Sequence, residues 1–65
     1  MTEQEARQLK VGDRVMWRKE PDNYGVIVSL DQSVEVTVWW FYGRYACRLP
    51  YGDDEWSCID RLPAA

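Results

Sequence analysis

The sequence contains no histidine and only two cysteines, which removes most familiar catalytic and metal-binding arrangements. Histidine is the most common general base and the most common metal ligand. Cys47 and Cys58 fall short of the four ligands that a structural zinc site needs, and they lack Cys-x-x-Cys spacing. There is also no phosphate-binding loop and no Ser/His/Asp set, so we expect no catalytic residues, no metal and no cofactor. An active site formed only between subunits stays open as an alternative.

Long apolar segments are also missing. The longest wholly apolar or aromatic stretch runs from Val38 to Gly43 and is far too short to span a bilayer. The first residues, Met1 to Leu9, are polar and acidic, unlike a secretory leader. We therefore expect a cytoplasmic protein without membrane contact, in which Cys47 and Cys58 are reduced, small and buried.

Aromatic side chains, in contrast, are abundant for a chain of 65 residues, with four Trp, four Tyr and one Phe. This length allows one domain with a small core, so some of these rings are expected on the surface. Exposed aromatic residues often mark binding surfaces. The net charge of -3 does not favour nucleic acid as a partner, because affinity for phosphates depends on positive charge.

The residues Thr2-Glu3-Gln4-Glu5 have the pattern of a helix capping box. They predict a short helix over about Glu3 to Leu9, ended by Gly12. Because two helical turns are marginal alone, we expect Ala6 and Leu9 to pack on the rest of the fold. Residues 1–10 are therefore predicted to be an N-terminal helical arm.

From Val11 onward the apolar residues alternate with polar ones, as in β-strands. The first strand is predicted to bury Val11, Val15 and Trp17, and 20–23 are predicted to be a turn. The next strand is predicted to bend. A bend would bury Ile27 and Leu30, whereas strict alternation would bury Val26 and Val28.

The later segments continue the pattern of short strands and turns. A turn is predicted at 31–33, and the clearest strand follows, with apolar residues at Val34, Val36, Val38 and Trp40. Further predicted elements are a turn at 42–43, a strand over 44–49, a break at 50–53, and a 3₁₀ turn with a short strand within 56–62. This spacing predicts a mainly all-β fold, a small five-stranded barrel closed to protect its edges.

The ordered motifs resemble the SH3-like barrel group, which includes Tudor and KOW modules. The resemblance rests on Val11-Gly12-Asp13-Arg14-Val15, Gly25-x-Ile27 and Val36-x-Val38-x-Trp40 with Gly43, and on the closing Ile59 and Leu62. It implies an SH3-like barrel over 11–62, followed by a tail over 63–65. Such domains often carry acidic residues where Phe41 and Tyr42 stand here. The resemblance implies no particular ligand, because this fold hosts many functions.

A second resemblance is to the plasmid-borne type II dihydrofolate reductases, short SH3-like chains that act as tetramers. It rests on Gly12-Asp13-Arg14-Val15, Gly25-x-Ile27-Val28 and Asp60-Arg61-Leu62. Where those enzymes carry a pore-forming Val-Gln-Ile-Tyr segment, this chain has Tyr51-Gly52-Asp53-Asp54, which argues against that activity. The resemblance implies a shared scaffold, a tendency to assemble, and a mobile-element or phage accessory gene as the source.

The aromatic residues supply the main candidate site. In Tudor-like barrels, rings near the end of the first strand, the following loop and the third strand can form a cage around a methylated cation. The residues placed for such a site, or for an exposed interaction face, are Trp17, Tyr24, Trp39, Phe41 and Tyr42. The same face could instead be buried between copies of the chain. The acidic run Asp53-Asp54-Glu55 is read as a solvated turn that could also receive a basic peptide.

Positive side chains supply an alternative site. A shared outer face that binds single-stranded nucleic acid would consist of Arg14, Arg18, Lys19, Arg44 and Arg48. The preferred hypothesis is a non-enzymatic adaptor that recognises a peptide or protein through its exposed aromatic face. The alternatives are nucleic-acid binding and a homo-oligomer whose site lies between subunits.

Overall fold

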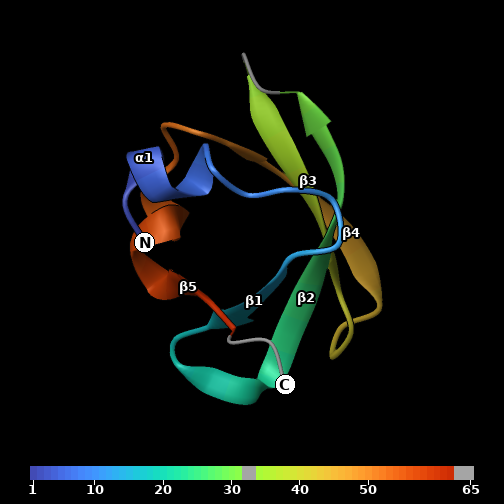
Figure 1. Ribbon diagram of the computed structural model, residues 1–65. Helices are drawn as coiled ribbons and strands as arrows, with labels where there is room; N and C mark the ends of the chain where they lie inside the picture. Colours follow the sequence, from blue (N-terminus) through green and yellow to red (C-terminus); the bar gives the residue numbers. More distant parts are fainter. Residues whose placement is uncertain (32–33, 63–65) are drawn as a thin grey trace.

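The structure is a computed structural model that describes residues 1–31 and 34–62 of the chain. Its elements are shown in Figure 1. In chain order they are α1 (Glu3–Ala6), β1 (Arg14–Trp17), β2 (Glu20–Asp31), β3 (Glu35–Trp40), β4 (Tyr45–Pro50), η1 (Asp54–Cys58) and β5 (Ile59–Arg61). The mainly β architecture with a short N-terminal helix is the predicted one. The predicted turn at 31–33 and the tail at 63–65 fall wholly or partly outside the described residues.

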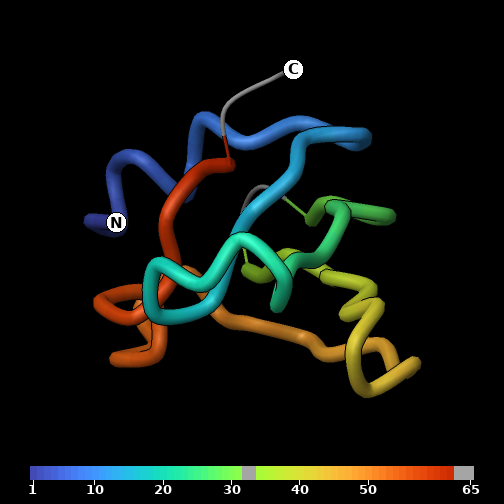
Figure 2. The backbone as a smooth tube through the Cα atoms, turned by 90° about the horizontal axis from the view of Figure 1, so that it is seen from below, coloured from blue at the N-terminus to red at the C-terminus, as the bar shows by residue number. Residues whose placement is uncertain are grey.

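The five strands form one antiparallel sheet in the order β4-β3-β2-β1-β5. Because β4 and β5 are the two edges, the sheet is not closed, and the predicted closed barrel is wrong. β5 has only three residues, and its partner in the sheet is β1, at the far side from β4. In Figures 1 and 2 the curved sheet brings the first and last segments of the chain side by side.

One face of the curved sheet carries the core. In β3 the buried residues Val36, Val38 and Trp40 alternate with the outward Glu35, Thr37 and Trp39, as predicted. On the neighbouring strands the core is completed by Val15, Ile27, Leu49 and Ile59. The alternation thus sets which rings face inward and which face outward.

The second strand bends as predicted. Its register against β3 shifts between Ile27 and Ser29, which leaves Val28 exposed. Ile27 is buried, and Leu30 packs against the core. A β-bulge of this kind inserts one residue and turns the strand, so it contributes to the curvature of the sheet.

Two other local predictions are wrong. The turn between β1 and β2 lies at Arg18 and Lys19, which have positive φ angles of 50° and 60°, and 20–23 belong to β2. Val11 is 63% exposed because it lies in a turn before β1, where the Asp13 N–H bonds to the Lys10 carbonyl. Val34 is also exposed, one residue ahead of β3.

The N-terminal segment packs on the core. The capping box forms, with Glu5 N–H donating to Thr2 Oγ1 and Thr2 N–H to the Glu5 carboxylate. These hydrogen bonds from Thr2 hold the pKa of the Glu5 carboxyl below its ordinary value. The α-helix ends at Ala6, earlier than predicted, and tighter i→i+3 bonds lead to Leu9. Ala6 and Leu9 are fully buried, as predicted.

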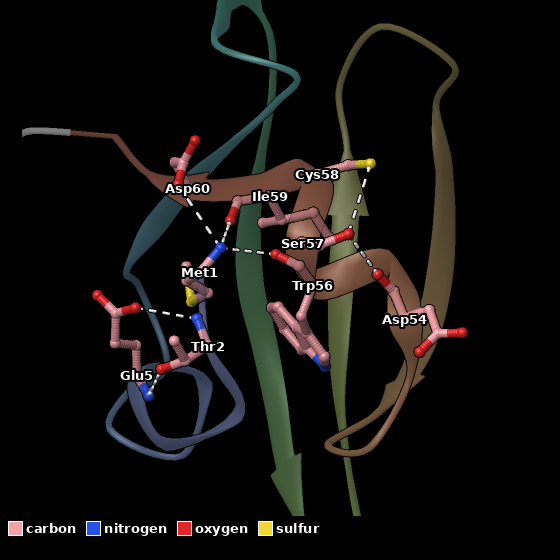
Figure 3. A network of polar contacts seen from close by, with 9 residues as sticks. All are labelled: Met1, Thr2, Glu5, Asp54, Trp56, Ser57, Cys58, Ile59 and Asp60. Atoms are coloured by element: carbon pink, nitrogen blue, oxygen red, sulfur yellow. Dashed lines mark hydrogen bonds and ion pairs between the residues drawn. The ribbon is translucent and has the colours of Figure 1, made fainter.

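The amino group of Met1 is held against the last elements of the chain (Figure 3). It donates to the carbonyl of Trp56 at 2.6 Å and to the carbonyl of Ile59, and it lies 3.6 Å from the Asp60 carboxylate. Trp56 is buried beside it, and the Trp56 indole N–H donates to the Pro50 carbonyl. The start of the chain is thereby tied to η1 and β5.

Within residues 1–31 and 34–62, no helix has the length and apolar character needed to cross a membrane.

Gly25 is a position where this packing can be tested. A Cβ there would lie 2.7 Å from the Trp39 carbonyl oxygen, 2.7 Å from Val38 Cγ1 and 2.9 Å from Trp40 Cε3. We expect Gly25→Ala to lower the free energy of unfolding by about 1–3 kcal/mol, because backbone and core must move. Urea unfolding followed by tryptophan fluorescence measures this.

The matched control is Gly52→Ala. The nearest atom to a Cβ at Gly52 is Glu3 Oε1 at 3.9 Å, and the φ angle of Gly52 is not positive. This variant should unfold within about 0.5 kcal/mol of the wild type, since it adds no clash. Equal stability of the two variants would contradict the close approach of β2 and β3 at Gly25.

Candidate functional site

A groove at one end of the sheet brings together aromatic residues from three strands, β1, β3 and β4. In an antiparallel meander the end of β1, the start of β2, the end of β3 and the start of β4 lie at the same end. The groove there has a volume of about 230 Å³. Its lining residues are Trp17, Asn23, Trp40, Tyr45, Cys47 and Glu55, and we call it the aromatic groove.

The two tryptophans form perpendicular walls. The ring centroids of Trp17 and Trp40 are 6.4 Å apart and their planes make an angle of 83°. Trp40 is only 5% exposed and is fixed in the core, whereas Tyr45 on the neighbouring strand is 53% exposed. The groove therefore joins a rigid buried ring to two more accessible rings, which suits a partly apolar guest.

The charged side chain that lines the groove is negative. It is the Glu55 carboxylate, and among the described residues no positively charged side chain lines the groove. Burial raises the pKa of the Cys47 thiol, and the carboxylates of Glu55 and Asp53 raise it further. The negative charge of these carboxylates repels the thiolate, and the same negative charge would attract a positively charged guest.

A cation already lies over one of these rings. The guanidinium carbon of Arg18 is 5.5 Å from the centroid of the Trp17 ring. Arg18 is presented by the tight β1–β2 turn, where its φ of 50° lies in the left-handed region. Such turns favour Asn and Gly, so Arg18 is held in a less favourable backbone conformation. The Trp17 ring face thus accepts a positive charge from the chain itself.

The structure separates the aromatic residues that the sequence grouped as one candidate site. Of the five aromatic residues in that candidate site, only Trp17 lines the aromatic groove. Tyr24 and Phe41 stack at 4.9 Å with an angle of 23° between their planes. Trp39 alternates with buried residues of β3 and faces outward, and Tyr42 is 83% exposed in the β3–β4 turn.

The sequence reasoning missed most of the groove. Trp40 was predicted as an apolar strand residue, Tyr45 was not among the candidate site residues, and Glu55 was placed in a solvated turn. Asn23 was placed in a turn that is instead part of β2. The direction of the strands could have predicted this grouping, because in antiparallel neighbours the end of one strand lies beside the start of the next.

The five cations of the alternative site do not form one cluster. Arg14 and Arg48 lie on β1 and β4, two strands that are not neighbours in the sheet. Arg48 is 3.8 Å from the Glu35 carboxylate. Arg18 and Lys19 form the β1–β2 turn, and Arg44 lies in the β3–β4 turn.

The cysteines are free and half-buried. Cys47 lies on β4 and Cys58 in η1, so they are not neighbours on paired strands. Among the described residues, no group of three or more His, Cys, Asp or Glu side chains is arranged to hold a metal ion. The chemistry that the groove can offer is therefore ring faces, a carboxylate, an amide and one protonated thiol.

Comparison of the chain with protein-family profiles, with curated proteins and with solved structures finds no match in any of the three.

The Cys47 thiol provides a direct test of the groove's charge. Because its pKa is raised, Cys47 has less thiolate at pH 8 than an unperturbed thiol and should react slowly with iodoacetamide. We expect Glu55→Gln to increase that rate by roughly twofold, since it removes a nearby negative charge. Peptide mapping by mass spectrometry follows each cysteine separately.

Asp54→Asn is the matched control, because it makes the same charge change one residue away, at a carboxylate that does not line the groove. Its effect on Cys47 should be smaller than that of Glu55→Gln. If the two variants react alike, the Glu55 carboxylate does not act on the Cys47 thiol.

Proposed function

We propose that this chain is a small non-enzymatic binding module that captures a protein segment by receiving one of its positively charged side chains. The aromatic groove is the proposed receptor. A lysine or arginine side chain would lie between the Trp17 and Trp40 rings, with Tyr45 beside it and Glu55 balancing its charge. The observation that carries this proposal is the perpendicular pair of tryptophans beside the Glu55 carboxylate, which forms no ion pair with any residue that the structure describes.

The physical basis is the attraction between a cation and the electron-rich face of an aromatic ring. The position of Arg18 over Trp17 supports this use of the ring. Arg18 would then compete with the ligand for the Trp17 ring face, and the ligand would either displace Arg18 or bind beside it. An alkylated ammonium is less hydrated than a free one, so a methylated lysine should lose less solvation when it enters the groove.

The order of the strands supports membership of the SH3-like class as part of the proposal. In the observed sheet β5 pairs with β1, and four hairpin-linked strands, β1 to β4, precede it. The nucleic-acid alternative has less support, because Arg14 and Arg48 lie on strands, apart from the cations in the turns, and Arg48 is paired with Glu35. For a shared outer surface to bind phosphates, its cations would need to lie together.

The test is calorimetric titration with capped Gly–Ser peptides that carry one trimethyl-lysine, one lysine or one acetyl-lysine. We expect affinity to fall in that order, with the neutral acetyl-lysine weakest. Tyr45→Ala should weaken the lysine peptides by roughly fivefold, corresponding to about 1 kcal/mol for one exposed cation–π contact. Because Tyr45 is more than half exposed, this variant should remain folded.

Two matched comparisons define the result. Glu55→Gln should weaken binding more than Asp54→Asn, and bound peptide should slow alkylation of Cys47 more than that of Cys58. Light scattering on the same samples shows whether the oligomeric state of the protein changes when the peptide binds. If acetyl-lysine and lysine peptides bind alike, or Tyr45→Ala changes nothing, the groove is not a cation receptor.

A further inference from the structure

A second hollow adjoins the aromatic groove. It has a volume of about 230 Å³ and is lined by Glu20, Asp22, Asn23 and Tyr42. Asn23 also lines the aromatic groove, so the two hollows are neighbours that share this residue as a wall. Their lining residues form a path from Glu55 in η1, past Asn23, to Tyr42 in the β3–β4 turn.

The carboxylates along this path are unused by the fold. In the part of the chain that the structure describes, Glu20, Asp22 and Glu55 form no ion pair and their side chains accept no hydrogen bond. Several carboxylates elsewhere are paired: Asp13 with Arg61, Glu35 with Arg48, and Asp60 with the Met1 amine.

The second hollow also offers a ring. Tyr42 is 83% exposed in the β3–β4 turn, and the two carboxylates that share its hollow come from the start of β2. A ring face beside two carboxylates repeats the chemistry of the aromatic groove in a more open form. Both hollows therefore suit a cation, and both lack a positively charged lining residue.

We infer that the ligand is a segment with two positively charged side chains, one in the aromatic groove and the other beside Tyr42, between Glu20 and Asp22. This inference rests on the proposed function of the aromatic groove. Once the first side chain is bound, the second contact is intramolecular, so it adds affinity only at spacings that reach the second hollow. Arg18 and Lys19, which precede Glu20 at the turn, oppose the same ligand and limit the gain.

The experiment compares capped Gly–Ser peptides with one lysine against peptides with two lysines separated by one to five residues. Affinities are measured by calorimetry at about 150 mM salt, where distant charges are largely screened. We expect one or two spacings to bind on the order of tenfold more tightly than the single-lysine peptide, from an exposed ion pair and a ring contact. A gain of about twofold at every spacing would reflect only two equivalent lysines competing for one site, and it would overturn the inference.

The double variant Glu20→Gln/Asp22→Asn should abolish the gain and leave the affinity for the single-lysine peptide within about twofold of the wild type. The matched control, Glu3→Gln/Glu35→Gln, makes the same change in net charge at carboxylates that line neither hollow, and it should keep the gain. An equal loss in both double variants would show a general charge effect and overturn the inference. Failure of single-lysine peptides to bind would instead overturn the proposed function, so the two failures are distinguishable.

Discussion

The close approach of β3 to Gly25 is the constraint on which the rest of the structure depends. Gly25 pairs with Trp40 across the sheet and with Val15 on the other side, and the missing side chain leaves room for the Trp40 ring. The ring can therefore be almost fully buried and still form a wall of the aromatic groove. Its fixed position determines where Trp17 meets it edge-on. One glycine in β2 thus links the packing of the core to the geometry of the site.

Much of the fold could be predicted from the sequence, because its signals are local. The Thr2/Glu5 capping box, the alternation over β3 and the bend at Ile27 all depend on neighbouring residues, and all are found. The closed barrel was wrong because closure depends on how the two edge strands meet, which no local pattern contains. The β1–β2 turn was also misplaced, since Pro21 and Asp22 are strong turn formers, whereas Arg18 and Lys19 give no sequence signal for the left-handed backbone that they adopt.

The candidate site was less predictable than the fold. An aromatic residue in a strand points to one of two faces, and a shift of one residue reverses the choice. Trp39 and Trp40 illustrate this, because they are adjacent in sequence but lie on opposite faces, and only Trp40 lines the groove. Tyr45 reaches the groove through its pairing with Trp40, which depends on the β3–β4 register, and Glu55 comes from η1, outside the sheet. The sequence could therefore predict that aromatic residues would be exposed, but it could not predict which of them share a hollow.

The bonds of the Met1 amine have a consequence for how the chain is made. Its acceptors lie 55 and 58 residues further along, and β1 needs β5 as a neighbour. A chain that emerges from the ribosome therefore cannot complete its sheet before Ile59–Arg61 are free. At roughly 5–20 residues per second, the aromatic residues stay exposed for seconds while the chain waits for its last strand. Such distant pairings make folding slow relative to the chain's length, because no local segment can complete the sheet alone.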